Sequence, residues 1–225
     1  MNVWALLVAA GAGERLGSDR PKAFAGLGEL PLLAEPLRRL DESSWIDAIV
    51  VAVPASWEEP AILLAEELAA TKVVAVVTGG ATRAESVRAA LAEVPEDALV
   101  VIVHDAARPL VSEAVIERVL APLVSPLAEG WDGVVPGLPL TDTVKSVDGD
   151  RVTGTESREK LVAVQTPQAF LAPKLREAYE GDLTGATDCS SLVEARGGRV
   201  KVVEGDPRLL KVTTRADLEQ VAAWL

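Results

Sequence analysis

The chain has 225 residues, of which 49% are hydrophobic and 25% are charged, and its formal net charge is -12. This length suits one α/β domain with a sizeable core, and no apolar run approaches the roughly 20 residues that a membrane span needs. The acidic balance argues against a nucleic-acid binder or a binder of anionic membranes, so any anionic ligand must meet a local basic pocket.

The first half of the chain alternates between strand-like and helix-like patterns. Short runs of Val, Ile, Leu and Ala predict strands covered on both faces over residues 3–9, 48–53, 72–77 and 99–103. Helical patterns lie between them over residues 31–40, 58–70 and 82–93. This alternation predicts a parallel sheet with helices on both faces, in which ligands bind at the carboxyl ends of the strands.

The apolar N-terminus is interpreted as the first strand of this sheet. It lacks the basic start of a signal peptide and leads directly into glycines instead of a cleavage site. A single cysteine, Cys189, excludes an internal disulfide and fits a reducing compartment. We therefore expect a cytoplasmic protein.

The second half begins with a predicted strand over residues 132–136 and then changes rhythm. Residues 140–157 alternate in polarity around Asp148-Gly149, which is a strong signal for a β-hairpin. Since an isolated two-stranded ribbon is marginal in water, we expect it to pack against a partner subunit. Strand, helix, strand and helix patterns follow at 161–164, 175–179, 200–203 and 215–225.

These patterns predict one Rossmann-like domain over residues 1–225. We expect a mostly parallel twisted sheet with helices on both faces, and a protruding β-hairpin that serves as a dimerisation arm at about residues 138–158.

The first candidate motif is a glycine-rich turn, AAGAGERLG over residues 9–17. Such a turn lets backbone N–H groups approach phosphate oxygens, although a tight turn without a ligand has the same pattern. The spacing GxGxxxG is one residue longer than the dinucleotide fingerprint and lacks the Gly-Lys-Ser/Thr ending of a P-loop. Arg15 and Lys22 add two cations that suit a triphosphate, so we favour a phosphate-binding loop.

The second motif is VHDAARP over residues 103–109, at the carboxyl end of a predicted central strand. This edge is where an α/β sheet places substrate or metal contacts. Asp105 and Arg108 can bind a ligand there or form a structural ion pair with each other. His104, the single histidine, can act as a general base, but a buried and hydrogen-bonded ring is the stronger interpretation.

A third motif, GGATRAES over residues 79–86, follows another strand and opens a helix. The two glycines allow close backbone approach to a base or ribose, and Thr82 can cap the helix together with Glu85. Arg83 and Ser86 can face either the ligand or the solvent. Three later segments, QTPQ at 165–168, Thr187-Asp188 and Lys211-Val212-Thr213, are weak signals individually.

Together these segments resemble the 2-C-methyl-D-erythritol 4-phosphate cytidylyltransferases of the non-mevalonate isoprenoid pathway. The resemblance covers nearly the whole chain in order, through AAGAGERLGSDRPKAF, GGATRAESV, VHDAARP, TDTVK, QTPQAF, TDCSSLVE and EGDPRLLKVTT. VHDAARP with QTPQ is specific within the wider group of nucleotide-sugar pyrophosphorylases, whereas the glycine loop alone is not.

The resemblance implies transfer of the cytidyl group of CTP to 2-C-methyl-D-erythritol 4-phosphate, with release of pyrophosphate. The acceptor phosphate is already ionised, so no side-chain base is required. Mg²⁺ would be bound mainly through the CTP phosphates, without protein metal ligands. The rate would come from alignment of the two anions and neutralisation of the developing charge.

The resemblance also implies a role for individual residues. The phosphates of CTP would be wrapped by Ala10, Gly11, Ala12 and Gly13, the base and ribose would meet Gly80 and Ser86, and catalysis would use Arg15, Lys22 and Lys211. The acceptor would be held by Asp105, Arg108, Thr166, Thr187 and Lys211, with Thr143 and Arg158 reaching it from the arm of the other subunit in a homodimer.

Two departures and three alternatives accompany this interpretation. Ala81 stands where relatives often carry Asp, and Leu209-Leu210 precede Lys211 where many relatives read Asn-Ile. A cytidylyltransferase for ribitol 5-phosphate or another polyol phosphate is the nearest alternative. A noncatalytic nucleotide-binding regulator is an alternative of another class, and the glycine spacing makes a dehydrogenase least favoured.

Overall fold

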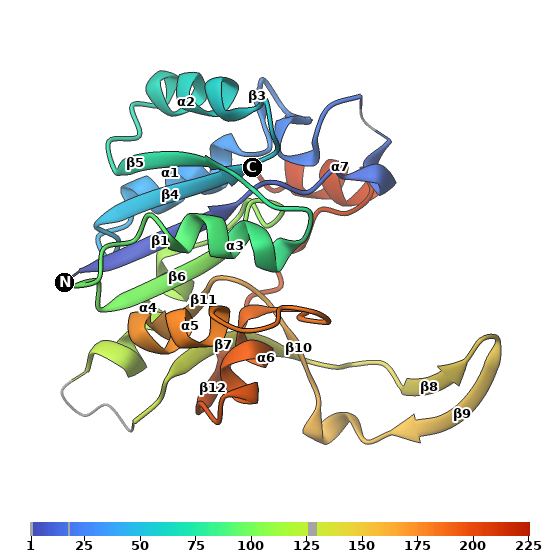
Figure 1. Cartoon of the computed structure of the whole chain (residues 1–225). Helices are drawn as coiled ribbons and strands as arrows, with labels where there is room; N and C mark the ends of the chain where they lie inside the picture. Colours follow the sequence, from blue (N-terminus) through green and yellow to red (C-terminus); the bar gives the residue numbers. More distant parts are fainter. Residues whose placement is uncertain (1, 18, 126–129) are drawn as a thin grey trace.

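Within residues 2–17, 19–125 and 130–225, which the computed structural model describes, the chain forms an eight-stranded mixed sheet (Figure 1). The strand order is β10-β7-β11-β6-β1-β4-β5, and β12 pairs with β7. The strands are β1 Val3–Val8, β4 Ala48–Val53, β5 Val73–Thr78, β6 Val100–Asp105, β7 Gly133–Pro139, β10 Val162–Val164, β11 Gln168–Leu171 and β12 Val200–Glu204.

Most of the strands run parallel, as the sequence predicted. β1 pairs in parallel with β4 and β6, and β4–β5 and β7–β12 are also parallel pairs. β10 and β11 run antiparallel to β7, and β11 also runs antiparallel to β6. The expectation of a mostly parallel α/β sheet is therefore confirmed.

The strand order contains a switch point between β1 and β6. The chain runs from β1 outward to β4 and β5, and then returns to form β6 on the opposite side of β1. Loops leaving β1 and β6 therefore diverge, which opens a crevice at the carboxyl ends of these strands. The register pairs Val8 with Asp105, so the loop after β1 begins beside the end of β6.

Helices cover both faces of the sheet because alternate strand residues point to opposite sides. One core contains Leu7, Ile49 and Ile102 and packs against α1 Ala34–Glu42, α2 Glu58–Glu67 and α4 Glu113–Val124. The opposite core contains Leu6 and Val101 and packs against α3 Arg83–Leu91, α5 Ala172–Tyr179 and α6 Cys189–Ala195. Among the described residues, every helix is too short or too polar to cross a bilayer.

A third apolar cluster fixes the C-terminal segment. It joins Leu27, Leu32 and Leu110 to Val212 and Val221. These residues connect the small hairpin of β2 Gly26–Leu27 and β3 Leu30–Pro31 to helix α7 Arg215–Ala222. The cluster anchors residues 211–212 beside the glycine loop.

Several elements differ from the sequence expectations. Strand β5 lies at the edge of the sheet, where Val74 is 56% exposed, so the prediction that it is covered on both faces is wrong. The first helix begins at Ala34 rather than residue 31 because residues 26–31 form the β2–β3 hairpin. Strand β11 and helices α4 and α6 were not among the predicted elements.

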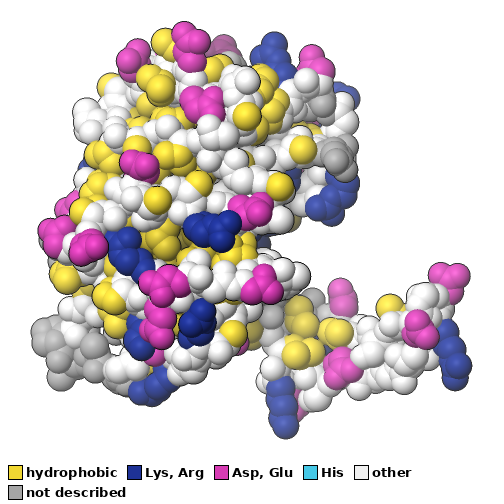
Figure 2. Space-filling model, viewed as in Figure 1, with side chains coloured by type: hydrophobic (Ala, Val, Ile, Leu, Met, Phe, Trp, Pro, Cys, Tyr) yellow, Lys and Arg dark blue, Asp and Glu magenta, His cyan; other side chains and the backbone are white. Residues whose placement is uncertain are grey.

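The predicted β-hairpin is present as β8 Val144–Asp148 and β9 Arg151–Glu156. Gly149 adopts φ 55° in the turn, a conformation that favours glycine. The hairpin forms its own two-stranded sheet and projects from the body of the molecule (Figure 1). Hydrophobic atoms gather where it leaves the body (Figure 2), and Leu161, Val162 and Val164 there are 37–42% exposed. Dimerisation through this arm stays a prediction.

Candidate active site

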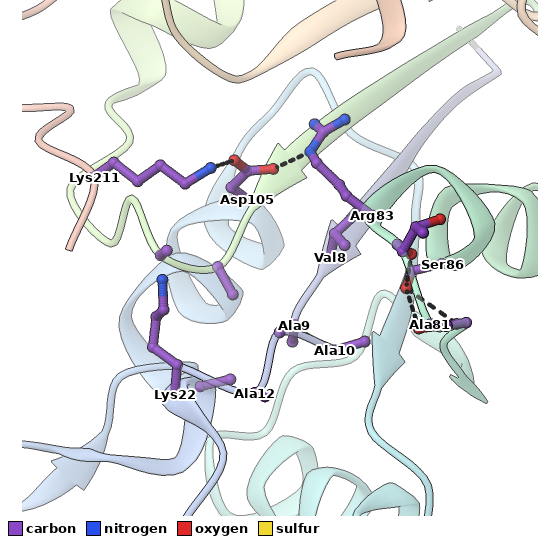
Figure 3. Close-up of a pocket in the computed structure, with 16 residues that line it drawn as sticks. Val8, Ala9, Ala10, Ala12, Lys22, Ala81, Arg83, Ser86, Asp105 and Lys211 are labelled. Carbon is purple, nitrogen blue, oxygen red and sulfur yellow. Dashed lines mark hydrogen bonds and ion pairs between the residues drawn. The ribbon is translucent and has the colours of Figure 1, made fainter. Parts of the chain in front are cut away.

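A pocket of about 350 Å³ opens at the switch point of the sheet, beside the carboxyl ends of β1 and β6 (Figure 3). Its wall is formed by residues 8–12, residues 80–83 with Ser86, and residues 105–107. Lys22 and Lys211 complete the lining from the N-terminal and C-terminal segments. Residues that lie far apart in the sequence therefore meet where the topology predicts a ligand site.

The glycine loop contributes backbone to this pocket. Ala10, Gly11 and Ala12 line it, and their N–H groups have no acceptor among the residues that the structure describes. Gly13 adopts φ 75°, and a Cβ added there would lie 2.6 Å from Cβ of Lys22. A glycine is therefore required for the turn and for the close approach of Lys22.

Two lysines make the pocket basic within an acidic protein. Lys22 begins the short helix η2 Lys22–Phe24 and donates from Nζ to the carbonyl of Val212 at 3.1 Å. Burial and the nearby charges of Lys211 and Arg15 lower the pKa of Lys22. A bound polyphosphate would relieve this repulsion, so the arrangement favours an anionic ligand.

Arg15 is placed differently from the sequence expectation. It lies on the short helix η1 Glu14–Leu16, is exposed, and is not among the residues that line the pocket. Its charge is close enough to affect Lys22. Arg15 therefore stands at the margin of the site, and its part in catalysis stays a prediction.

The Gly79-Gly80 pair serves packing within the protein. A Cβ on Gly79 would lie 2.4 Å from Cβ of Ala10, and one on Gly80 would lie 2.2 Å from Cβ of Glu85. Ser86 Oγ accepts from the Gly80 N–H at 3.1 Å and donates to the carbonyl of Thr82 at 2.9 Å. The glycines thus let this loop press against both the glycine loop and helix α3.

The predicted helix cap at Thr82 is confirmed. Its side chain accepts from the Glu85 N–H, and the Glu85 carboxylate accepts from the Thr82 N–H, which completes a capping box. This cap fixes the first turn of α3, from which Arg83 and Ser86 project toward the pocket (Figure 3).

A buried carboxylate lies between two cations at the top of the pocket. Asp105 accepts from Arg83 Nε at 2.8 Å and from Lys211 Nζ at 2.7 Å (Figure 3). Burial alone would raise the pKa of Asp105, but the charges and hydrogen bonds of Arg83 and Lys211 outweigh burial and hold that pKa well below its usual range. Asp105 is therefore ionised throughout the physiological pH range.

The alternative of an ion pair between Asp105 and Arg108 is wrong. Arg108 Nη1 donates instead to the carbonyl of Leu209 at 2.6 Å, because the turn after β6 directs it toward the C-terminal segment. The true partner, Arg83, was named in the sequence motif without a role. Its pairing depends on how α3 packs over β1 and β4, which no local pattern reveals.

A second pocket of about 460 Å³ adjoins the first. It contains Arg108, Thr166 and Thr187, as expected for an acceptor site. Both pockets share Arg83, Asp105 and Lys211. This shared ionic cluster forms a common wall, so ligands in the two pockets would meet beside it.

Two glutamines of the QTPQ segment organise the second pocket. The Gln165 amide donates to the Asp206 carbonyl at 2.9 Å and accepts from the Asp206 N–H at 3.0 Å. The Gln168 amide donates to Asp188 at 2.8 Å and accepts from the Cys189 N–H at 3.2 Å. The sequence motif contained these residues, but only the fold shows that they join three segments of the chain.

His104 lies behind the pockets and lines neither of them. It is fully buried, with Nε2 2.9 Å from the Arg108 carbonyl and Nδ1 3.1 Å from Thr166 Oγ1. Burial lowers the pKa of His104 to about 4. The interpretation of a buried, hydrogen-bonded ring is confirmed.

Thr143 and Arg158 are not brought to either pocket of their own chain. Both are exposed at the base of the hairpin arm, and the Arg158 guanidinium donates to the carbonyl of Thr141. Their predicted contact with an acceptor in another subunit stays a prediction.

The chain resembles proteins of known activity. The family model described as 2-C-methyl-D-erythritol 4-phosphate cytidylyltransferase matches residues 3–225. A protein of that name from Nocardia farcinica is 49% identical over 218 residues, which are 96% of this chain and 91% of the relative. Another of that name, from Saccharopolyspora erythraea, is 46% identical over 230 residues and the match spans 100% of both chains.

Solved structures agree with the sequence comparisons. The crystal structure of the Francisella tularensis 2-C-methyl-D-erythritol 4-phosphate cytidylyltransferase matches with a TM-score of 0.84 and 28% identity, over 100% of both chains. The similarity therefore extends through the whole fold.

Proposed function

The chain belongs to the 2-C-methyl-D-erythritol 4-phosphate cytidylyltransferase family, and we infer that it transfers the cytidyl group of CTP to 2-C-methyl-D-erythritol 4-phosphate. The products are 4-diphosphocytidyl-2-C-methyl-D-erythritol and pyrophosphate, in the biosynthesis of isoprenoid precursors. The observation that carries the function is the pair of pockets joined at Arg83, Asp105 and Lys211. The ribitol phosphate and noncatalytic alternatives are not favoured by the comparisons.

We propose that the first pocket binds CTP. Ala10, Gly11, Ala12 and Gly13 supply a loop whose backbone N–H groups can bind phosphate oxygens. Residues 80–83 and Ser86 form the opposite wall, where Gly80 and Ser86 bound the space for the base and ribose. Ala81 offers no carboxylate there, so backbone groups of this wall carry the recognition of cytosine.

We propose that the second pocket binds the methylerythritol phosphate. Asp105 is an ionised acceptor for hydroxyl groups, while Arg108, Thr187 and Lys211 supply donors in the same pocket. The Arg108 carbonyl accepts from His104 Nε2, so in a neutral ring Nδ1 accepts the Thr166 hydroxyl proton, and Thr166 can then only accept from the ligand.

The chemical step is an in-line displacement at the α-phosphorus of CTP. An acceptor phosphate oxygen forms the new bond to this phosphorus, and the bond from it to the oxygen bridging to the β-phosphate breaks, which releases pyrophosphate. Lys22 stabilises the charge that develops in the transition state, and Arg15 joins it from the margin of the pocket. No side chain needs to remove a proton, since the attacking phosphate is ionised near neutral pH.

We propose Mg²⁺ as the metal of this reaction. Among the described residues no group of three or more His, Cys, Asp or Glu side chains is arranged to hold a metal. Asp105 is the carboxylate that lines the first pocket, and Arg83 and Lys211 already pair with it. This donor set fits an ion held mainly by phosphate oxygens and water, which would neutralise charge on the triphosphate.

We also propose a cytoplasmic homodimer formed through the hairpin arm. Val147 and Val152 of the arm are 63% and 56% exposed. Exposed apolar side chains on an isolated two-stranded ribbon are unfavourable in water. A partner subunit would cover it and receive Thr143 and Arg158. The lone buried thiol of Cys189 fits a reducing compartment.

Substrate profiling tests the function directly. Pyrophosphate release is measured with each nucleoside triphosphate and either 2-C-methyl-D-erythritol 4-phosphate or ribitol 5-phosphate. Release only with CTP and methylerythritol phosphate is the expected result. A preference for ribitol 5-phosphate would identify that compound as the acceptor. CTP binding without release of pyrophosphate would support a noncatalytic regulator.

A further inference from the structure

His104 has no part in the reaction proposed above, yet its surroundings connect it to the acceptor pocket. It is the single histidine of the chain and lies at the second-last position of β6, directly before Asp105. It is 0% exposed. A side chain sealed in this way cannot touch a substrate, so any effect on the reaction must pass through its neighbours.

The hydrogen bonds of the ring define its tautomer. Nε2 lies 2.9 Å from the carbonyl oxygen of Arg108, and a carbonyl can only accept, so Nε2 carries a proton. The ring is neutral at physiological pH because burial lowers the pKa of His104 to about 4. Nδ1 of a neutral ring must then be unprotonated, and it accepts the hydroxyl proton of Thr166 at 3.1 Å.

This chain of hydrogen bonds, called the relay below, continues to the backbone of Asp105. Thr166 Oγ1, having donated to the ring, accepts the backbone N–H of Asp105 at 3.1 Å. One imidazole therefore joins the end of β6, the turn that carries Arg108 and the loop between β10 and β11. Asp105, Arg108 and Thr166 are the three proposed acceptor contacts that these segments carry.

Asp105 lines both pockets, but Ser86 and Lys22 of the nucleotide pocket lie outside this relay. Ser86 is held by Gly80 and Thr82, and Lys22 is held by the carbonyl of Val212. Neither residue bonds to the ring, to Thr166 or to the carbonyl of Arg108. A fault in the relay should therefore disturb the acceptor pocket and leave the nucleotide pocket largely intact.

We propose that His104, protonated on Nε2, is a positioning residue for the acceptor: it sets the relative placement of Asp105, Arg108 and Thr166. This inference rests on the proposed function, because that function assigns these three residues to the acceptor. It gives the buried histidine a role in the KM for the acceptor and none in proton transfer.

Two substitutions each remove one hydrogen bond of the His104 ring and keep the other. The Gln amide in His104→Gln can reach the position of Nε2 and donate to Arg108, but it loses the bond from Thr166. The Asn amide in His104→Asn can accept from Thr166 near the position of Nδ1, but it does not reach Arg108. Each variant should raise the KM for methylerythritol phosphate about tenfold, while the KM for CTP stays within about twofold.

The outcomes of this kinetic test are distinguishable. An unchanged acceptor KM in both variants, or an equal rise in both KM values, would overturn the role of His104. A wild-type protein that releases no pyrophosphate with methylerythritol phosphate would instead overturn the proposed function. Thermal unfolding of each variant establishes that the protein compared is folded.

A spectroscopic test uses the wild-type protein and does not depend on the variants folding. Since the chain has one histidine, its ¹⁵N imidazole signals need no assignment. At pH 7 we expect the proton on Nε2, and a shift of the Nδ1 signal when methylerythritol phosphate is added to the enzyme without CTP. A proton on Nδ1, or signals that do not respond to the acceptor, would overturn the proposal.

Discussion

Replacing Gly13 by alanine tests whether the shape of the glycine loop positions Lys22. Gly13 and Gly17 both adopt positive φ, at 75° and 68°. An alanine at either position pays a similar conformational cost of about 1–2 kcal/mol. The two sites differ in their surroundings, since a Cβ at Gly17 meets nothing within 4 Å, whereas one at Gly13 lies 2.6 Å from Cβ of Lys22.

The contact at Gly13 cannot be relieved by rotating the end of a flexible side chain. The added Cβ would also lie 3.1 Å from both Cα and the backbone N of Lys22, so the backbone that starts η2 must move. A misplacement of about 1 Å at a reacting group can cost about 100-fold in rate. We therefore expect Gly13→Ala to lower kcat about 100-fold, and Gly17→Ala to stay within about threefold.

The assay is steady-state pyrophosphate release, with thermal unfolding as a parallel measure of stability. Both variants carry the same backbone cost, and Gly13→Ala adds the contact with Lys22, so its Tm should fall somewhat more while its kcat falls far more. Equal kcat values for Gly13→Ala and Gly17→Ala would refute the argument that this glycine positions Lys22.

Three further predictions concern charged and titratable groups of the site. Lys22→Ala should lower turnover by at least about 1000-fold, because Lys22 stabilises charge in the transition state. It should not lower Tm, because burial and neighbouring cations already disfavour the charged lysine in the fold. An unchanged turnover would show that Lys22 has no part in the mechanism. Asp105→Asn should cost about 3 kcal/mol in the free energy of unfolding, measured in urea, since Arg83 and Lys211 lose their shared counterion; a loss below about 1 kcal/mol would contradict this. The pKa of His104 is about 4 in the folded protein and about 6.5 in the unfolded chain. The neutral ring therefore makes its full contribution to stability above pH 6.5. This contribution is lost as the pH falls toward 4, by up to about 1.4 kcal/mol per pH unit, because the unfolded chain binds the proton first. An NMR titration that finds the ring protonated in the folded protein at pH 6 would contradict that sign.

The sequence was sufficient to predict the central architecture. Strands β1, β4 and β6 are continuous apolar runs that lie in the middle of the sheet, where both faces are covered and the local pattern matches the tertiary environment. Asp105 and the glycine loop could be placed at one edge, because parallel strands end together. The hairpin turn at Gly149 was also readable from local chemistry.

Elements that depend on tertiary contacts were not predictable. Strand β11 has four residues and α6 has seven, and Gln168 joins them by bonding to Asp188 and to the Cys189 N–H. Such short segments are stabilised by their neighbours more than by their own propensity. Helix α4 is a different case, since Val115, Ile116 and Val119 carry a helical period that is visible in the sequence.

The candidate site shows the same division. Residue types and spacing identified cations and a carboxylate near a phosphate-binding loop. The ion pair they offered for Asp105, as one of two alternatives, was with Arg108 and not with Arg83. The capping box that begins α3 was predicted, but the pairing of Arg83 with Asp105 depends on how α3 packs on the sheet, which the spacing of the residues does not reveal.

The most direct test of the account is ³¹P NMR of the enzyme with CTP and Mg²⁺, before and after addition of 2-C-methyl-D-erythritol 4-phosphate. Transfer between ligands in two adjoining pockets predicts no pyrophosphate before the acceptor is added, and then pyrophosphate and a diphosphate ester in equal amounts. Pyrophosphate formed from CTP alone, or no diphosphate ester after the acceptor is added, would contradict it.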